Sequence, residues 1–153
     1  MRNRFDEQLG QLNNHLLEMG ALIERSIENA TQAMVDRDVE KAKSAIAADE
    51  EINQKERDIE SLCFKLLLQQ QPVAKDLRLI SSALKMITDM ERIGDQAADI
   101  AGIVSYIANE PEIKGLAHLS QMGQNAIIMV RGSLDLARPG RLDSAEHQSI
   151  RHD

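Results

Sequence analysis

The hydrophobic positions of the chain form four long stretches with helical spacing. In the first stretch, from residue 5 to residue 34, apolar side chains recur at steps of three or four. That spacing puts them on one face of an α-helix. Charged residues interrupt the pattern at Arg37 and Asp38, where we expect the chain to turn. The predicted stripe consists of Phe5, Leu9, Leu12, Leu16, Met19, Ile23, Ile27, Ala30 and Met34.

The second and third stretches predict a helical hairpin. The second helix is expected from about Val39 to Leu68, and the third from about Val73 to Ala108. Pro72 lies between them, where its fixed φ is suited to opening a helix but not to continuing one. The apolar set of the second helix is Val39, Ala42, Ile46, Ile52, Ile59, Leu62, Leu66 and Leu67. The third has two stripes: Val73, Leu77, Ile80, Leu84 and Ile87 on one side, and Leu79, Met86, Met90, Ile93, Ala97 and Ile100 on the other.

The fourth stretch resembles the first. "LLEMGALIERSI" and "HLSQMGQNAIIMV" superpose at a shift of 103 residues, which aligns Met19 with Met122 and Gly20 with Gly123. We infer an internal repeat of about a hundred residues, of which the second copy has only its first helix here. This helix should begin near Ile113 and present an apolar stripe that its own repeat leaves uncovered. The stripe is Leu116, Leu119, Met122, Ala126, Val130 and Leu134.

These stretches predict an all-α fold. Residues 1–110 would form a three-helix bundle, residues 111–137 the first helix of an incomplete second repeat, and residues 138–153 a poorly ordered tail. Aromatic residues make up 2% of the chain, so the core must be built from aliphatic side chains and Met, as packed helices allow. An uncovered stripe on the fourth helix further predicts a homodimer or a higher homo-oligomer.

Charge and cysteine content exclude several classes. A net charge of -7 argues against nucleic-acid binding, which needs clustered Lys and Arg. Cys63 is the single cysteine, so there is no disulfide framework, and we expect it to be a small buried hydrophobe in a reducing compartment. No apolar run approaches the length of a membrane span, and the N-terminus lacks the apolar core of a signal peptide. A cytoplasmic protein that meets the inner face of the membrane only through partners is expected.

The stretch "MERIGDQAAD" places three carboxylates one helical turn apart: Glu91, Asp95 and Asp99. If the hairpin turns near Pro72, residues equidistant from the turn face each other. Asp49 would then lie level with Asp95, and Asn53 level with Glu91. The turn after the first helix would bring Glu24 and Glu28 to about the same height.

Oxygen donors without His or Cys suit a hard cation: Mg²⁺, Ca²⁺, Mn²⁺ or oxygen-ligated iron. By this registry the candidate metal ligands are Asp49, Asn53, Glu91, Asp95 and Asp99, and Gly94 would let a neighbouring backbone or an ion approach. The alternative is a structural, oligomerising bundle whose acidic face is solvated and paired with Arg57, Arg78, Lys85 or Arg92. A di-metal enzyme is disfavoured because no Glu-x-x-His pair is present, and no catalytic residue is expected.

The acidic segments carry a family resemblance. "ADEEINQKERDIE" and "DMERIGDQAADIA", with "LLEMGALIERSIENATQAM" before them, resemble the PhoU family of phosphate-transport regulators. The resemblance implies two three-helix repeats that bind metal ions, including iron, on their acidic motifs. Here these motifs would be Asp49, Glu50 and Asn53 on the second helix, and Glu91, Asp95 and Asp99 on the third. Asn53 stands where that family often has Asp. It also implies a non-enzymatic adaptor that links a phosphate ABC transporter ATPase to a sensor histidine kinase and restrains the phosphate-starvation response.

Overall fold

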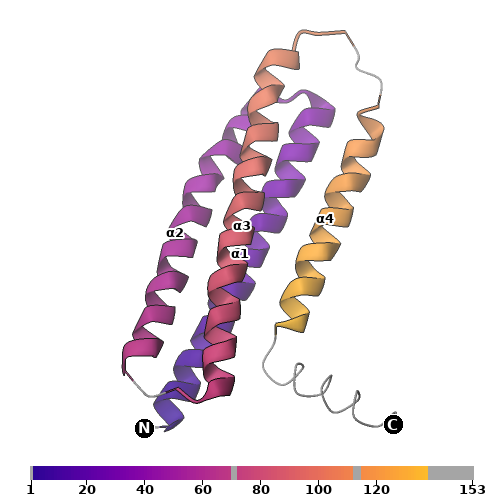
Figure 1. Ribbon diagram of the computed structural model, residues 1–153. Coiled ribbons are helices and arrows are strands. Elements are labelled where there is room, and N and C mark those ends of the chain that lie inside the picture. Colours follow the sequence, from indigo (N-terminus) through magenta and orange to yellow (C-terminus); the bar gives the residue numbers. More distant parts are fainter. Residues whose placement is uncertain (1, 70–71, 112–114, 138–153) are drawn as a thin grey trace, which may run out of the picture.

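Four helices make up the described chain. The computed structural model describes residues 2–69, 72–111 and 115–137. In chain order the helices are α1 (Arg2–Asp36), α2 (Val39–Gln69), α3 (Ala74–Ile107) and α4 (Ala117–Leu136). Figure 1 shows α1, α2 and α3 side by side, with α4 running beside them in the direction opposite to α1. The all-α prediction and the four helix positions are confirmed; the predicted tail and the predicted start near Ile113 lie outside the described residues.

The turns form where the sequence predicts them. Arg37 leaves α1 with φ 53, a left-handed conformation that ends the helix. Its guanidinium donates to the backbone oxygen of Glu110, which ties this turn to the end of α3. At the other end, the Val73 backbone N–H donates to the Asp76 carboxylate at 3.3 Å and thereby satisfies one of the free amides that start α3.

The core is aliphatic, as the composition predicts. Ile and Leu side chains fill the half of the bundle nearest the α2–α3 turn, whereas the half nearest the α1–α2 turn is rich in alanine. Every residue of the predicted α1 stripe is buried except Leu9, which packs against the same core. Cys63 is fully buried, which confirms its role as a small hydrophobe.

Three positions predicted to be apolar core are exposed instead. Ile46 is exposed on α2, and Ala45 takes the buried place beside it. Val73 and Leu77 are exposed at the start of α3. Val73 and Leu77 lie where the predicted stripe runs past the cover of the neighbouring helices, because periodicity gives a face but not the extent of its partner. Ile46 lies between buried residues of α2, so there the predicted face is displaced by one residue.

α4 packs on α1 through two glycines. A Cβ on Gly20 would lie 2.3 Å from Leu134 Cδ1, and one on Gly123 would lie 2.9 Å from Thr31 Cγ2. The Arg131 guanidinium donates to both carboxylate oxygens of Glu24, at 2.7 and 2.9 Å, beside this contact.

The α4 stripe is therefore only partly uncovered. Val130 and Leu134 are buried against α1, so the prediction that they are exposed is wrong, whereas Met122 is exposed as predicted. The other large exposed apolar side chains of α4 are Ile128, Met129 and Leu136. None of the helices within residues 2–69, 72–111 and 115–137 has the length and hydropathy of a membrane span.

Candidate functional site

The acidic segments of α2 and α3 meet, as the hairpin registry predicts. Asp95 on α3 shares a hydrogen bond with Glu91, one turn earlier, and this contact raises the pKa of Glu91 to about 7. Burial and the negative charges around Glu91 act in the same direction. Across the hairpin, burial and a hydrogen bond with Asp95 raise the pKa of Asp49. Carboxyl groups that share a hydrogen bond also share a proton, so this cluster resists full ionisation.

Two oxygens at the centre of the cluster have no partner. The Oδ1 atoms of Asp49 and Asn53 are both buried and accept no hydrogen bond. The two residues lie one turn apart on α2, on the side that faces Glu91 and Asp95. A buried oxygen without a donor is costly in free energy, so such a pair indicates a site that a cation or a water would complete.

Glu56 belongs to the cluster, although it was not among the site residues predicted from the sequence. Burial and the charges of Glu60 and Asp95 raise its pKa, and its charge in turn raises the pKa of Glu91. Glu56 follows Asn53 by three residues and Asp49 by seven, the spacing of a single helix face, and this spacing could have revealed it. Asp99 lies at the edge of the site, where it is exposed but its charge still raises the pKa of Asp49.

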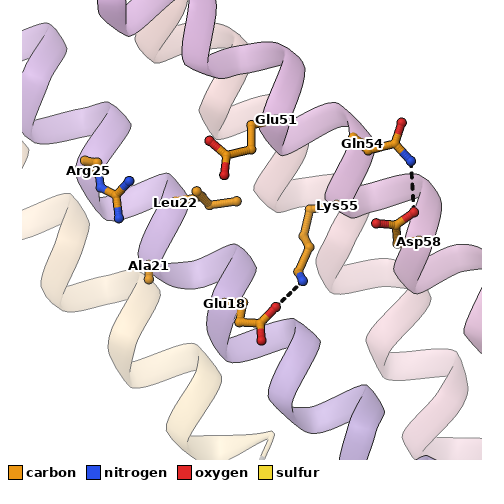
Figure 2. A pocket seen from close by; sticks show the side chains of 8 residues that line it. All are labelled: Glu18, Ala21, Leu22, Arg25, Glu51, Gln54, Lys55 and Asp58. Atoms are coloured by element: carbon orange, nitrogen blue, oxygen red, sulfur yellow. Dashed lines mark hydrogen bonds and ion pairs between the residues drawn. The ribbon is translucent and has the colours of Figure 1, made fainter.

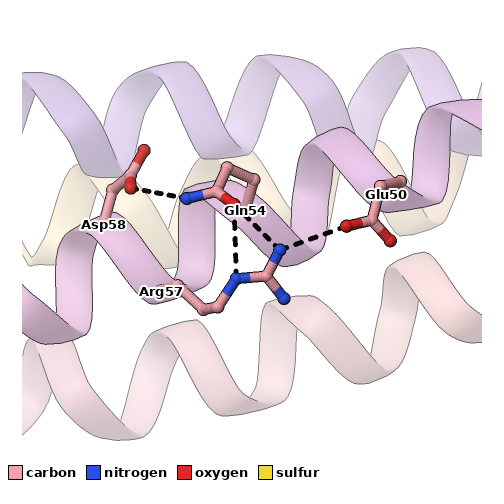
Figure 3. A network of polar contacts seen from close by, with 4 residues as sticks. All are labelled: Glu50, Gln54, Arg57 and Asp58. Carbon is pink, nitrogen blue, oxygen red and sulfur yellow. Dashed lines mark hydrogen bonds and ion pairs between the residues drawn. The ribbon is translucent and has the colours of Figure 1, made fainter.

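Glu50 points away from the cluster. Its carboxylate accepts a hydrogen bond at 3.1 Å from Arg57, which also contacts the Gln54 side chain on the outer face of α2 (Figure 3). Consecutive helical residues point about 100° apart, so Glu50 cannot share the face of Asp49. Its charge still contributes to the raised pKa of Asp49.

Two further expectations about this level of the bundle are not met. Glu24 pairs with Arg131 on α4, and Glu28 lines a groove beside α4, so neither residue faces the acidic cluster. Gly94 admits neither backbone nor ion: a Cβ there would lie 3.2 to 3.3 Å from methyl groups of Ile52 and Ile23. This glycine instead lets isoleucines from two helices pack against the α3 backbone, directly behind the site.

The cations expected to pair with the acidic face leave the centre of the cluster unneutralised. Arg57 pairs with Glu50, and Arg92 lies 3.9 Å from Asp89 outside the cluster. The charge of Arg57 lowers the pKa of Glu56, but the interactions that shift the pKa of Asp49 and of Glu91 all raise it. The solvated-face alternative therefore describes Glu50 better than it describes Asp49 or Glu91.

A second polar groove, between α1 and α2, is lined by three acidic and two basic residues, and its Lys55 is already paired with Glu18. Figure 2 shows the Lys55 ammonium pointing to the Glu18 carboxylate, and Lys55 Nζ also lies 2.8 Å from His15 Nδ1. The contact with Lys55 lowers the pKa of Glu18. The groove has a volume of about 440 Å³ and is lined by Glu18, Ala21, Leu22, Arg25, Glu51, Gln54, Lys55 and Asp58.

The donor set of the α2–α3 cluster suits a hard metal ion. It offers carboxylate oxygens and one amide oxygen, with no nitrogen or sulfur ligand, and its raised pKa values reflect charge that a cation would neutralise. Among the described residues, no group of three or more His, Cys, Asp or Glu side chains is already spaced to hold a metal. The long Glu91 and Glu56 side chains would have to rotate inward to join Asp49 and Asp95.

Comparison with known proteins identifies the family. The model of the PhoU domain matches residues 16–104, which include the whole acidic cluster. A phosphate-specific transport system accessory protein PhoU homolog from Pseudomonas putida is 38% identical over 86% of this chain and 52% of its own length. One from Clostridium acetobutylicum is 33% identical over 99% of this chain and 70% of its own length.

A solved structure agrees with these sequence matches. The crystal structure of PhoU from Pseudomonas aeruginosa superposes with a TM-score of 0.81 at 37% identity, over 86% of this chain and 64% of that chain. The chain spans about half the length of the Pseudomonas relatives that it matches. The domain match, the sequence identities and the shared helical architecture lead to one conclusion: this chain belongs to the PhoU family.

Proposed function

We propose that this chain is a regulator of phosphate uptake that works as a metal-binding adaptor, without catalysis of its own. Its partners would be the ATPase of a phosphate ABC transporter and a phosphate-sensing histidine kinase, at the cytoplasmic face of the membrane. In this role it restrains the phosphate-starvation response when phosphate is plentiful. The names of its relatives, which are accessory proteins of phosphate-specific transport, support the proposal.

One structural observation carries the metal-binding part of the proposal: the unpartnered, buried Oδ1 atoms of Asp49 and Asn53. Asp49 contacts Asp95, whose carboxyl group is also hydrogen-bonded to Glu91, and Asn53 lies one turn from Asp49 on α2. A hard cation such as Fe, Mn or Mg would satisfy these oxygens and hold the carboxylates in their ionised form. Bound metal would supply fixed positive charge at a site that is otherwise strongly negative.

The residues of the site would have different tasks. Asp49, Asn53 and Asp95 are held by the packed centre of the α2–α3 hairpin, so they supply ligands with little rearrangement. Glu91 and Glu56 are long enough to close over the ion, and Asp99 lies exposed at the rim. An ion bound in this way would join α2 to α3 and give a partner protein a surface of altered charge.

The first test is metal content measured on protein purified without an affinity tag. We expect near-stoichiometric metal in the native chain and its loss in Glu91→Ala/Asp95→Ala. The matched control is Glu51→Ala/Asp58→Ala, which removes two carboxylates from the α1–α2 groove and should retain the metal. Because Glu50 is held by Arg57, Glu50→Ala should also retain it.

Absence of metal from the native chain, after incubation with Fe²⁺, Mn²⁺ and Mg²⁺ in turn, would favour the alternative of a structural bundle with a solvated acidic face. The regulatory part is tested separately, with a phosphate-starvation reporter in cells that lack their own PhoU protein. Expression of this chain should lower the reporter signal in high phosphate. If it does not, the adaptor proposal fails whatever the metal result.

The exposed apolar side chains of α4 support a homo-oligomer. Met122, Met129 and Leu136 recur every seven residues and are 64%, 72% and 65% exposed. A heptad of this kind is suited to pairing with the same helix of a second copy. Size-exclusion chromatography with light scattering should show a dimer or a larger species, and a stable monomer at high concentration would contradict this expectation.

A further inference from the structure

We propose that the end of the bundle at the α2–α3 turn binds directly to the surface of a membrane that contains anionic lipid. This end, called here the hairpin end, comprises the exposed apolar residues Phe64, Leu68, Val73 and Leu77 and the basic residues Lys65, Lys75 and Arg78. The proposal goes beyond the regulatory function and does not depend on it. It also revises the expectation from sequence that the membrane is met only through partner proteins.

Exposed apolar side chains gather at the hairpin end from both helices. Leu68 is 86% exposed, and Val73, across the turn, is 53% exposed. Phe64 lies one turn from Leu68 on α2, and Leu77 lies one turn from Val73 on α3. Because α2 and α3 are antiparallel, with Ile52 against Gly94, Leu68 and Leu77 lie at the same level. Four large apolar residues are thus exposed near the end of the rod-shaped bundle where α2 leads into α3 (Figure 1).

The charge of the hairpin end is opposite to that of the chain as a whole. Residues 61–84 contain three basic residues and one acidic residue, Asp76, in a chain of net charge -7. Lys65, Lys75 and Arg78 are exposed, whereas Asp76 is 4% exposed. The first turns of α1, which lie at the same end in Figure 1, add as many basic as acidic residues over positions 2–7 and leave the balance positive.

The acidic site lies too far away to repel a membrane at this end. Along α2, Glu56 is twelve residues from Leu68, or about 18 Å at a helical rise of about 1.5 Å, and Asp49 is about 28 Å away. The screening length at physiological salt is about 8 Å. An anionic surface that meets the bundle end-on therefore interacts with Lys65, Lys75 and Arg78, and the acidic cluster is screened.

The shape of the hairpin end favours a lipid surface over a protein partner. A peptide helix docks by laying an apolar face into a groove, but the two grooves described in this bundle flank α1 and lie along its sides. Apolar side chains that are exposed at an end and lie close in sequence to cations are instead suited to the boundary between head groups and acyl chains. Leu68 would insert, and Lys65 and Arg78 would bind phosphate groups of the lipids.

The test is co-sedimentation of the full chain with vesicles, in the presence of a chelator so that bound metal plays no part. We expect binding to vesicles rich in phosphatidylglycerol, little binding to vesicles of phosphatidylcholine alone, and a decrease as salt is added. Lys65→Gln/Arg78→Gln should lower the partition coefficient about 25-fold, since each cation near an anionic surface contributes about fivefold. Leu68→Ser should lower it about tenfold.

Matched controls place the same changes elsewhere on the surface. Met129→Ser removes an apolar side chain that is 72% exposed on α4, and Lys43→Gln/Arg92→Gln removes two cations whose side chains are 68% and 70% exposed. Both should leave vesicle binding unchanged. Equal losses in the test and control variants, or no preference for anionic vesicles, would overturn the proposal and assign the hairpin end to a protein partner.

Discussion

The contact between Gly20 on α1 and Leu134 on α4 leads to a quantitative prediction. Gly20→Ala introduces a Cβ that would lie 2.3 Å from Leu134 Cδ1, whereas carbon atoms in contact prefer about 3.5 to 4.0 Å. The Leu134 methyl group must therefore move by more than about 1 Å. Overpacking of this kind costs about 1 to 3 kcal/mol, whereas alanine in place of glycine within a helix gains about 1 kcal/mol.

Gly10 is the matched control for this substitution. It lies on the same helix, is exposed, and has no heavy atom within 4 Å of the position that a Cβ would take. Gly10→Ala should therefore raise the free energy of unfolding by up to about 1 kcal/mol. The free energy of unfolding of Gly20→Ala should be lower than that of Gly10→Ala by about 1 to 3 kcal/mol.

The assay is urea denaturation followed by far-ultraviolet circular dichroism, in two backgrounds. In Leu134→Ala the obstructing methyl group is gone, so Gly20→Ala should there become stabilising by about as much as Gly10→Ala. An equal effect of Gly20→Ala in the native and Leu134→Ala backgrounds would refute the proposed packing. So would equal effects of the two glycine substitutions in the native background.

Two further predictions concern titratable groups. The folded state raises the pKa of Glu91 from 4.5 to about 7, so between these pH values the native chain binds a proton that the unfolded chain has lost. In metal-free protein the free energy of unfolding should therefore fall as pH rises from about 4.5 to about 7. Urea titrations of Glu91→Gln should show a smaller fall over this range. A dependence of the opposite sign would show that the carboxyl groups of the cluster do not hold a shared proton. Burial raises the pKa of Cys63 to about 11, so iodoacetamide should leave the native thiol unmodified near pH 8 and alkylate it rapidly in urea; fast alkylation of the native chain would place Cys63 outside the core.

The sequence predicted the helices well because their signals are local. Steps of three and four placed the α1 stripe correctly, and Pro72 and Arg37 marked the turns. Burial at the helix ends was predicted less well. Val73 and Leu77 continue the apolar spacing of α3, but α1 and α2 do not cover them, and spacing along one helix holds no information about where its neighbours end.

The candidate site was predicted in part for the same reason. Equal distance from the α2–α3 turn placed Asp49 level with Asp95, and the shared hydrogen bond confirms that pairing. Distance from the turn gives the level of Glu24 in the bundle but not the neighbour that it faces. Glu24 was therefore expected near the cluster, whereas it pairs with Arg131. The direction in which each α2 residue points around the helix axis decides the remaining candidates. Glu50 points away from the cluster, and Glu56 points toward it.

The internal repeat explains why α4 binds α1 where it does. Gly20 contacts Leu134, and Gly123 contacts Thr31. A shift of 103 residues turns Gly20 into Gly123 and Thr31 into Leu134, so each contact is the repeat-related image of the other. Reciprocal contacts of this form are the mark of a two-fold relation, here between two helices of one chain.

The same shift accounts for the apolar face that α4 exposes. Met122 is exposed, but its repeat-related residue, Met19, is fully buried in the bundle core; Leu136 is exposed, and its counterpart Ala33 is buried. These α4 positions are therefore apolar because the repeat needs a core there, as α1 does. Substituting Met122 by a polar residue should consequently leave the stability of the described bundle nearly unchanged, whereas the same change at Met19 should be strongly destabilising. Comparable losses at the two positions would mean that this face of α4 is buried, either within a single chain or against a second copy.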